Sequence, residues 1–90
     1  MTLLVVGINY NTAPLALRER VSFVPDRLPD ALCSMSEYCG GVDVVILSTC
    51  NRTEIYTTNI DDAQRVLDWL SLFHGIDKND LAHCYYLHED

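Results

Sequence analysis

The chain has 90 residues, of which 49% are hydrophobic and 21% charged, as is typical of one soluble domain with a single modest core. A complete dinucleotide-binding domain and a substrate domain do not fit in this length, so we expect any redox cofactor to be bound elsewhere. Thirteen acidic and six basic residues give a net charge of −7. This charge disfavours non-specific attraction to phosphate backbones or anionic membranes.

The cellular compartment is predicted from two features of the sequence. No apolar run reaches the roughly eighteen residues of a membrane span, and no basic residue before Arg18 begins a signal peptide. We therefore expect a cytoplasmic protein with no membrane partner. In that compartment the four cysteines are better interpreted as reduced thiols than as two disulfides. They are Cys33, Cys39, Cys50 and Cys84.

The N-terminal residues predict a strand followed by a short helix. The apolar run 3–8 is typical of a buried strand that ends in a polar loop. Thr12 is a suitable cap for a helix that has Pro14 in its first turn and ends near Phe23. Loops at strand ends often carry functional residues, so the loop at 9–12 is of interest.

A second helix is predicted to begin at Asp26 and to end at Gly40 and Gly41. Its apolar residues follow helical spacing, and Cys33 lies off their stripe. The stripe consists of Leu28, Ala31, Leu32, Met35 and Cys39.

Two strands are predicted next, at 43–49 and 52–58, with Cys50 and Asn51 at the join. A third helix follows, with Asp61 and Asp62 at its positive end and Gly75 as its C-terminal stop. Its inner face consists of Ala63, Val66, Leu67, Leu70 and Phe73. The last predicted elements are a short capped helix at 77–84 and a fourth strand at 85–87.

This order of elements predicts an α+β fold for residues 1–90. We expect a mainly antiparallel sheet of about four strands with helices packed on it, in a ferredoxin-like arrangement. The polar loops after the first strand and between the second and third strands are the candidate functional segments.

The segment 48–54 reads Ser-Thr-Cys-Asn-Arg-Thr-Glu and follows directly on an apolar strand. A nucleophile at such a position would stand on a rigid support, and the Arg52 guanidinium would favour the Cys50 thiolate. Alternatively, Cys50 is a small buried hydrophobe at a strand end, which is the commoner situation of a free cysteine. Arg52 is either a surface charge paired with Glu54 or a bidentate clamp for a ligand carboxylate.

Other binding functions have weaker support in the sequence. His74, His83 and His88 have no C-x-x-C or H-E-x-x-H pattern around them, so we expect no metal site. The four glycines form no phosphate-binding loop. Three arginines within ten positions, Arg18, Arg20 and Arg27, form either a local basic strip or a solvated face paired with Glu19 and Asp26.

Two blocks of residues together point to a known family. The first block comprises Gly7-Ile8-Asn9, Thr12-Ala13-Pro14, Leu17-Arg18-Glu19 and Phe23. The second and more specific block is Leu47-Ser48-Thr49-Cys50-Asn51-Arg52-Thr53-Glu54-Ile55-Tyr56. With these blocks the chain resembles, over essentially its whole length, the N-terminal catalytic domain of glutamyl-tRNA reductases. Tyr10 and Asn11 depart from the histidine and lysine that this family usually has there.

The resemblance implies an enzyme that reduces glutamyl-tRNA to glutamate-1-semialdehyde with NADPH, the first step of tetrapyrrole (porphyrin and heme) biosynthesis. It implies that Cys50 forms a thioester with glutamate, and that Thr49, Asn51 and Arg52 bind the substrate. The NADPH-binding and dimerisation domains would lie outside this chain, and the complete enzyme would be a homodimer.

The partners implied by the resemblance are glutamyl-tRNA and the downstream glutamate-1-semialdehyde aminomutase. The residues also leave a non-enzymatic alternative, a small α+β regulatory or docking module with an incidental loop thiol. Selective alkylation of Cys50 over the other three cysteines would favour the enzyme.

Overall fold

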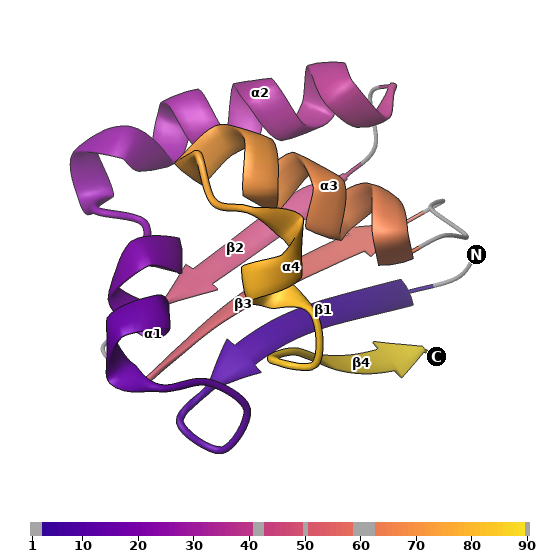
Figure 1. Cartoon of the computed structure of the whole chain (residues 1–90). Coiled ribbons are helices and arrows are strands. Elements are labelled where there is room, and N and C mark those ends of the chain that lie inside the picture. The colour runs from indigo at the N-terminus through magenta and orange to yellow at the C-terminus, as the bar shows by residue number, and fades with distance from the viewer. Residues whose placement is uncertain (1–2, 41–42, 50, 59–62, 90) are drawn as a thin grey trace.

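The protein is described by a computed structural model, which covers residues 3–40, 43–49, 51–58 and 63–89. Four strands form one antiparallel sheet in the order β2-β3-β1-β4, with the helices on one of its faces (Figure 1). This confirms the predicted α+β fold, a mainly antiparallel sheet of four strands with helices packed on it in a ferredoxin-like arrangement. The strands are β1 (Leu3–Asn9), β2 (Val44–Ser48), β3 (Arg52–Thr58) and β4 (Tyr86–Glu89).

The helices match the predicted ones closely in position. They are α1 (Leu15–Val21), the 3₁₀ turn η1 (Pro25–Arg27), α2 (Leu28–Cys39), α3 (Ala63–His74) and α4 (Lys78–Leu81). Gly40 and Gly75 follow α2 and α3 with φ of 81° and 65°, a left-handed conformation that glycine adopts without strain. Asp77 caps α4 by accepting a hydrogen bond from the Asn79 amide at 2.8 Å.

Two predicted helix caps are wrong. Thr12 does not cap α1, because its hydroxyl is bonded to the backbone of Asn9 and the helix begins after Pro14. Asp26 lies inside η1, and α2 begins two residues later. A cap at Asp26 would have to bond the amide of the second or third helical residue. The second, Leu28, donates its amide to the Pro25 carbonyl, and the third, Pro29, has none.

Two smaller differences concern the ends of predicted elements. The last helix covers only four residues, Lys78–Leu81, and the last strand begins at Tyr86 and not at Tyr85. Asp61 and Asp62, predicted at the start of α3, lie outside the described residues.

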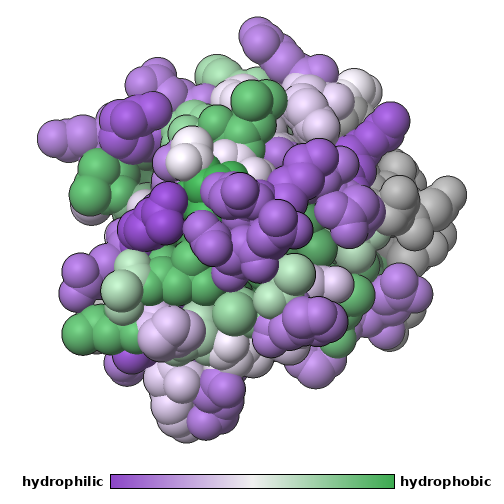
Figure 2. Space-filling view, viewed as in Figure 1, coloured by the Kyte–Doolittle hydropathy of each residue, from purple (hydrophilic) through white to green (hydrophobic). Residues whose placement is uncertain are grey.

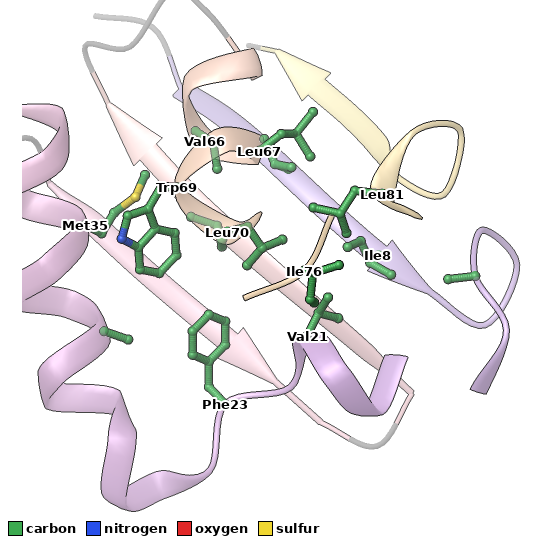
Figure 3. Close-up of a cluster of buried hydrophobic side chains, with 14 of the residues drawn as sticks. Ile8, Val21, Phe23, Met35, Val66, Leu67, Trp69, Leu70, Ile76 and Leu81 are labelled. Atoms are coloured by element: carbon green, nitrogen blue, oxygen red, sulfur yellow. The ribbon is translucent and has the colours of Figure 1, made fainter. Parts of the chain in front are cut away.

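The core lies between the sheet and the helices, and its centre is Trp69 of α3 (Figure 3). Trp69 is fully buried, as is Met35 of α2. Phe23 stacks on the indole ring with 5.9 Å between ring centroids, and the indole N–H donates to Ser34 Oγ at 3.0 Å. The Trp69 side chain thus joins three parts of the chain: α2, α3 and the segment after α1.

The surface on the helical side mixes hydrophilic and hydrophobic side chains (Figure 2). Its most exposed large hydrophobic residues belong to different elements, such as Leu15 in α1 and Leu72 in α3. Single exposed apolar side chains of this kind are normal on soluble proteins. In the part of the chain that the structure describes, no helix has the length and apolar character of a membrane span.

Truncation of Phe23 should strongly destabilise the domain. Phe23→Ala removes a buried ring that contacts Trp69 and Phe73, and we expect a loss of about 3–4 kcal/mol in the free energy of unfolding. Urea denaturation monitored by circular dichroism measures this loss. Tyr38→Ala on the exposed side of α2 is the control, with an expected change under about 1 kcal/mol. Equal effects of the two substitutions would contradict the assignment of the core.

Candidate functional site

One end of the sheet brings together the two polar segments that the sequence singled out. β1 and β2 both end there and β3 begins there, next to α1 (Figure 1). The antiparallel register pairs Asn9 with Arg52 and Ser48 with Thr53. The loop after β1 therefore lies beside the turn between β2 and β3, although about forty residues separate them in the sequence.

An open cavity of about 470 Å³ lies at this end of the sheet. Three of its lining residues, Thr49, Asn51 and Arg52, are the predicted substrate-binding residues. Asn9 and Tyr10 complete the lining. The predicted nucleophile, Cys50, lies outside the described residues, between two positions that line the cavity.

The loop after β1 is held by the side chain of Asn9. Its Oδ1 accepts hydrogen bonds from the amides of Asn11 and Thr12 at 2.9 and 3.1 Å. Thr12 Oγ1 in turn accepts from the Asn9 amide at 2.9 Å. This reciprocal bonding fixes the loop, from which the two-thirds exposed ring of Tyr10 projects. Sequence reasoning did not assign Asn9 to the site, since only the strand pairing places it beside Arg52.

The turn between β2 and β3 is closed by Thr49. Its backbone N–H donates to the Arg52 carbonyl at 2.8 Å, and its Oγ1 accepts from the amides of Asn51 and Arg52, both at 3.2 Å. The Thr49 hydroxyl is thus used to shape the turn. A ligand bonded to the Thr49 hydroxyl would share that hydroxyl with the backbone amides of Asn51 and Arg52.

Two further hydroxyls tie the turn to α1. Ser48 Oγ accepts from the Phe23 amide at 2.9 Å and lies 3.3 Å from Thr53 Oγ1. Thr53 Oγ1 also contacts the Val21 carbonyl at 3.4 Å. The base of the turn is therefore bonded to the end of α1, and through Phe23 to the core. Such anchoring suits a segment that must hold reactive groups in place.

Glu54 is a buried acidic residue of β3, only 7% exposed. It lies two residues after Arg52 on the same face of β3, because side chains alternate along a strand. Its Oε1 accepts from the Tyr56 hydroxyl at 2.9 Å, and its Oε2 from the Tyr86 hydroxyl at 2.5 Å. Among the described residues Arg52 forms no ion pair with Glu54, contrary to the surface-pair interpretation.

Glu54, Tyr56 and Tyr86 form a hydrogen-bonded group, the Glu54 cluster, in which the pKa values of both phenols are shifted. The hydrogen bond to Glu54, followed by burial and the Glu54 charge, raises the pKa of Tyr56. Burial, followed by the bond to Glu54, raises the pKa of Tyr86. The positive charge of Arg52 opposes the rise in both pKa values without reversing it. Sequence reasoning missed this cluster because its members come from two strands that are not adjacent in the sheet.

Gly7 provides the space that Tyr86 needs. It pairs with Glu54 on one side and with Tyr86 on the other, so the phenol has to cross β1 to reach the carboxylate. A β-carbon at position 7 would overlap the far end of the Tyr86 ring. Glycine is required here for a close approach of a side chain and not for its backbone angles.

The remaining thiols and imidazoles do not converge on the cavity. Cys33 is exposed on α2, in agreement with its place off the apolar stripe, and Cys84 is half-buried; both are free thiols. The side chain of Cys39 is outside the described part of the structure. Across residues 3–40, 43–49, 51–58 and 63–89, no three His, Cys, Asp or Glu side chains form a group that could hold a metal ion.

Two arginines of the candidate basic strip are paired, but not with the expected partners. Arg20 lies 3.8 Å from Asp80, and Arg27 lies 3.8 Å from Asp30 and over the Phe73 ring. Both ion pairs are largely exposed and contribute little to stability. Neither pair involves Glu19 or Asp26.

The fold and the site define a ferredoxin-like α+β domain with a polar cavity at the end of its sheet, lined by an arginine that suits an anionic ligand. Residues 6–90 match the family model described as "Glutamyl-tRNAGlu reductase, N-terminal domain". The chain belongs to this family.

Similar proteins include three that are named glutamyl-tRNA reductase. Those of Shewanella frigidimarina and Marinobacter nauticus are 44% and 46% identical over 100% of this chain and 21% of their own length. That of Pseudoalteromonas translucida is 44% identical over 99% of this chain and 22% of its own length. The chain thus spans about a fifth of the length of these relatives.

Substitution of Gly7 tests the Glu54 cluster by tyrosine titration. Because their pKa values are raised, Tyr56 and Tyr86 should stay protonated above pH 10 in the folded protein. The unfolded chain ionises them from about pH 10, so the stability that they contribute is present below pH 10 and is lost as the pH rises. In Gly7→Ala the displaced Tyr86 should ionise nearer pH 10, as measured by tyrosinate absorbance while circular dichroism confirms folding.

The control for this titration is Gly40→Ala, since a β-carbon at position 40 contacts nothing within 4 Å. It strains the end of α2 but leaves the cluster in place. An unchanged high-pH titration in Gly7→Ala would contradict the contact between Tyr86 and Glu54.

Proposed function

We propose that this chain is the catalytic N-terminal domain of a glutamyl-tRNA reductase, and that it forms the covalent bond to glutamate. The observation that carries the proposal is the cavity at the end of the sheet, where residues 49, 51 and 52 meet the loop after β1. The family membership and the names of the relatives support the assignment of substrate.

The proposed nucleophile is Cys50. Its thiolate would attack the carbonyl carbon of the ester that joins glutamate to the tRNA. A carbon–sulfur bond forms, the carbon–oxygen bond breaks, and the ribose oxygen leaves and takes up a proton from water. The Arg52 charge, at a position two residues along the chain, would favour the thiolate over the thiol. The product on the protein is a glutamyl thioester.

Arg52 is the proposed clamp for the glutamate side chain. Its guanidinium lines the cavity and has no ion pair among the described residues, so it is available to a carboxylate. A planar guanidinium can donate two parallel hydrogen bonds to a carboxylate, which fixes the ligand's orientation as well as its charge. Asn51 and Thr49 would complete the pocket beside it.

The described residues do not fit the nucleotide cofactor of the family, NADPH. Gly40 and Gly75 stand after helices, and Gly7 lies under Tyr86, so none of these glycines opens a strand-to-helix turn toward a phosphate. We propose that NADPH is bound outside this chain and that the contribution of this domain ends at the thioester.

The remaining proposals concern the complete enzyme. We propose that it acts in the cytoplasm as a homodimer on glutamyl-tRNA, at the first step of tetrapyrrole biosynthesis. Its aldehyde product is reactive, which favours transfer to the aminomutase that consumes it. With a net charge of −7, this chain is poorly suited to bind the tRNA body by itself.

Trapping the acyl-enzyme tests the nucleophile. A complete reductase with this chain as its N-terminal domain is incubated with glutamyl-tRNA labelled in glutamate, without NADPH, and the labelled residue is identified by mass spectrometry. We expect label on Cys50 and none in Cys50→Ser, because a hydroxyl is far less nucleophilic at neutral pH. Cys33→Ser, which removes an exposed free thiol, should leave labelling unchanged. Labelling that survives Cys50→Ser would overturn the assignment.

Arg52→Lys tests the clamp. Lysine keeps the charge but loses the two-pronged geometry, so we expect kcat/KM for glutamyl-tRNA to fall about 100-fold. Because Arg52 is exposed, the free energy of unfolding should change by less than about 0.5 kcal/mol. Arg27→Lys is the matched control, because Arg27 does not line the cavity. Unchanged kcat/KM in Arg52→Lys would argue against the clamp.

A further inference from the structure

Glu54 poses a problem for the proposed clamp. It is an acidic residue two positions from Arg52 on the same face of β3, on the strand that presents the guanidinium to the cavity. A carboxylate free to turn toward Arg52 would form an ion pair with it. It would then compete with any ligand carboxylate that enters the cavity.

Both oxygens of the Glu54 carboxylate are bonded to other groups. Tyr56, from the same strand, donates to Oε1, and Tyr86, from β4, donates to Oε2. The two phenols are neutral hydrogen-bond donors. They therefore satisfy the Glu54 oxygens without adding a second positive charge beside Arg52 that could also bind a ligand. A tyrosine hydroxyl is protonated at neutral pH whether or not its pKa is raised, so both phenols can donate.

The arrangement depends on three strands. Gly7 on β1 separates Glu54 on β3 from Tyr86 on β4, and its missing side chain lets the phenol pass over β1. One phenol is local to Glu54 and the other comes from across the sheet. The carboxylate is thus held from two directions.

We propose that Tyr56 and Tyr86 are positioning residues for substrate specificity, which hold the Glu54 carboxylate away from Arg52 and so keep the guanidinium available for a ligand carboxylate. This inference rests on the proposed function of Arg52 as the clamp. It predicts that the phenols affect substrate binding only through Glu54. Removing the negative charge of Glu54 should make them dispensable.

The experiment compares three variants of a complete reductase with this chain as its N-terminal domain. In Tyr56→Phe/Tyr86→Phe the freed carboxylate pairs with Arg52, and KM for glutamyl-tRNA should rise about tenfold while kcat stays within about twofold. Adding Glu54→Gln should return KM to within about twofold of the wild type, since the competing charge is gone. Tyr85→Phe, a neighbouring tyrosine packed against the core, should have no effect.

Circular dichroism and urea denaturation show whether each variant is folded. If the double variant does not fold, Tyr56→Phe alone replaces it, because Tyr56 is only half-buried. An unchanged KM on loss of the phenols would overturn the inference, as would a raised KM that Glu54→Gln does not restore. Arg52→Lys in the same assay separates the two proposals. If KM responds to Arg52→Lys but not to the tyrosines, the clamp stands and only the positioning role fails.

Discussion

The antiparallel pairing of β1 with β3 is the constraint on which the rest of the structure depends. This pair of strands forms the centre of the sheet. Its register places Asn9 beside Arg52 at one end of the sheet, and Gly7 beside Glu54 two residues further along each strand. The cavity and the carboxylate cluster both follow from this register. A shift by one residue would turn Arg52 and Glu54 toward the core and expose Ile55, which is 1% exposed here, so the buried face of β3 fixes the pairing.

Around the cavity, most polar side chains are engaged by the protein itself. Asn9 and Thr49 bond backbone amides of their own turns, and Ser48 bonds the segment after α1. Glu54 is held by two phenols. Arg52 stands apart, since it lines the cavity and has no ion pair in the described part of the chain. A site in which neighbouring groups are satisfied and one cation is left available is prepared for an anionic ligand.

The sequence predicted the strands and most of the helices because their signals are local. Apolar runs and helical spacing identify β1, β2 and α3, and glycines after α2 and α3 mark their ends. The caps at Thr12 and Asp26 were wrong for reasons that propensity does not contain. In one case the loop uses the hydroxyl. In the other, the Leu28 amide is bonded to the Pro25 carbonyl and Pro29 has no amide to offer.

By itself, the sequence determined the fold class, the family and the segment that carries the candidate residues 49, 51 and 52, since these rest on contiguous patterns. Only the tertiary structure decided that Asn9 and Tyr10 share their cavity, and that Tyr86 reaches Glu54 over Gly7. The physical reason is that strand register brings together residues that lie far apart in the chain, and no local pattern records it. Ninety residues are too few for a dinucleotide-binding domain and a substrate domain together, and the chain spans about a fifth of the length of its relatives.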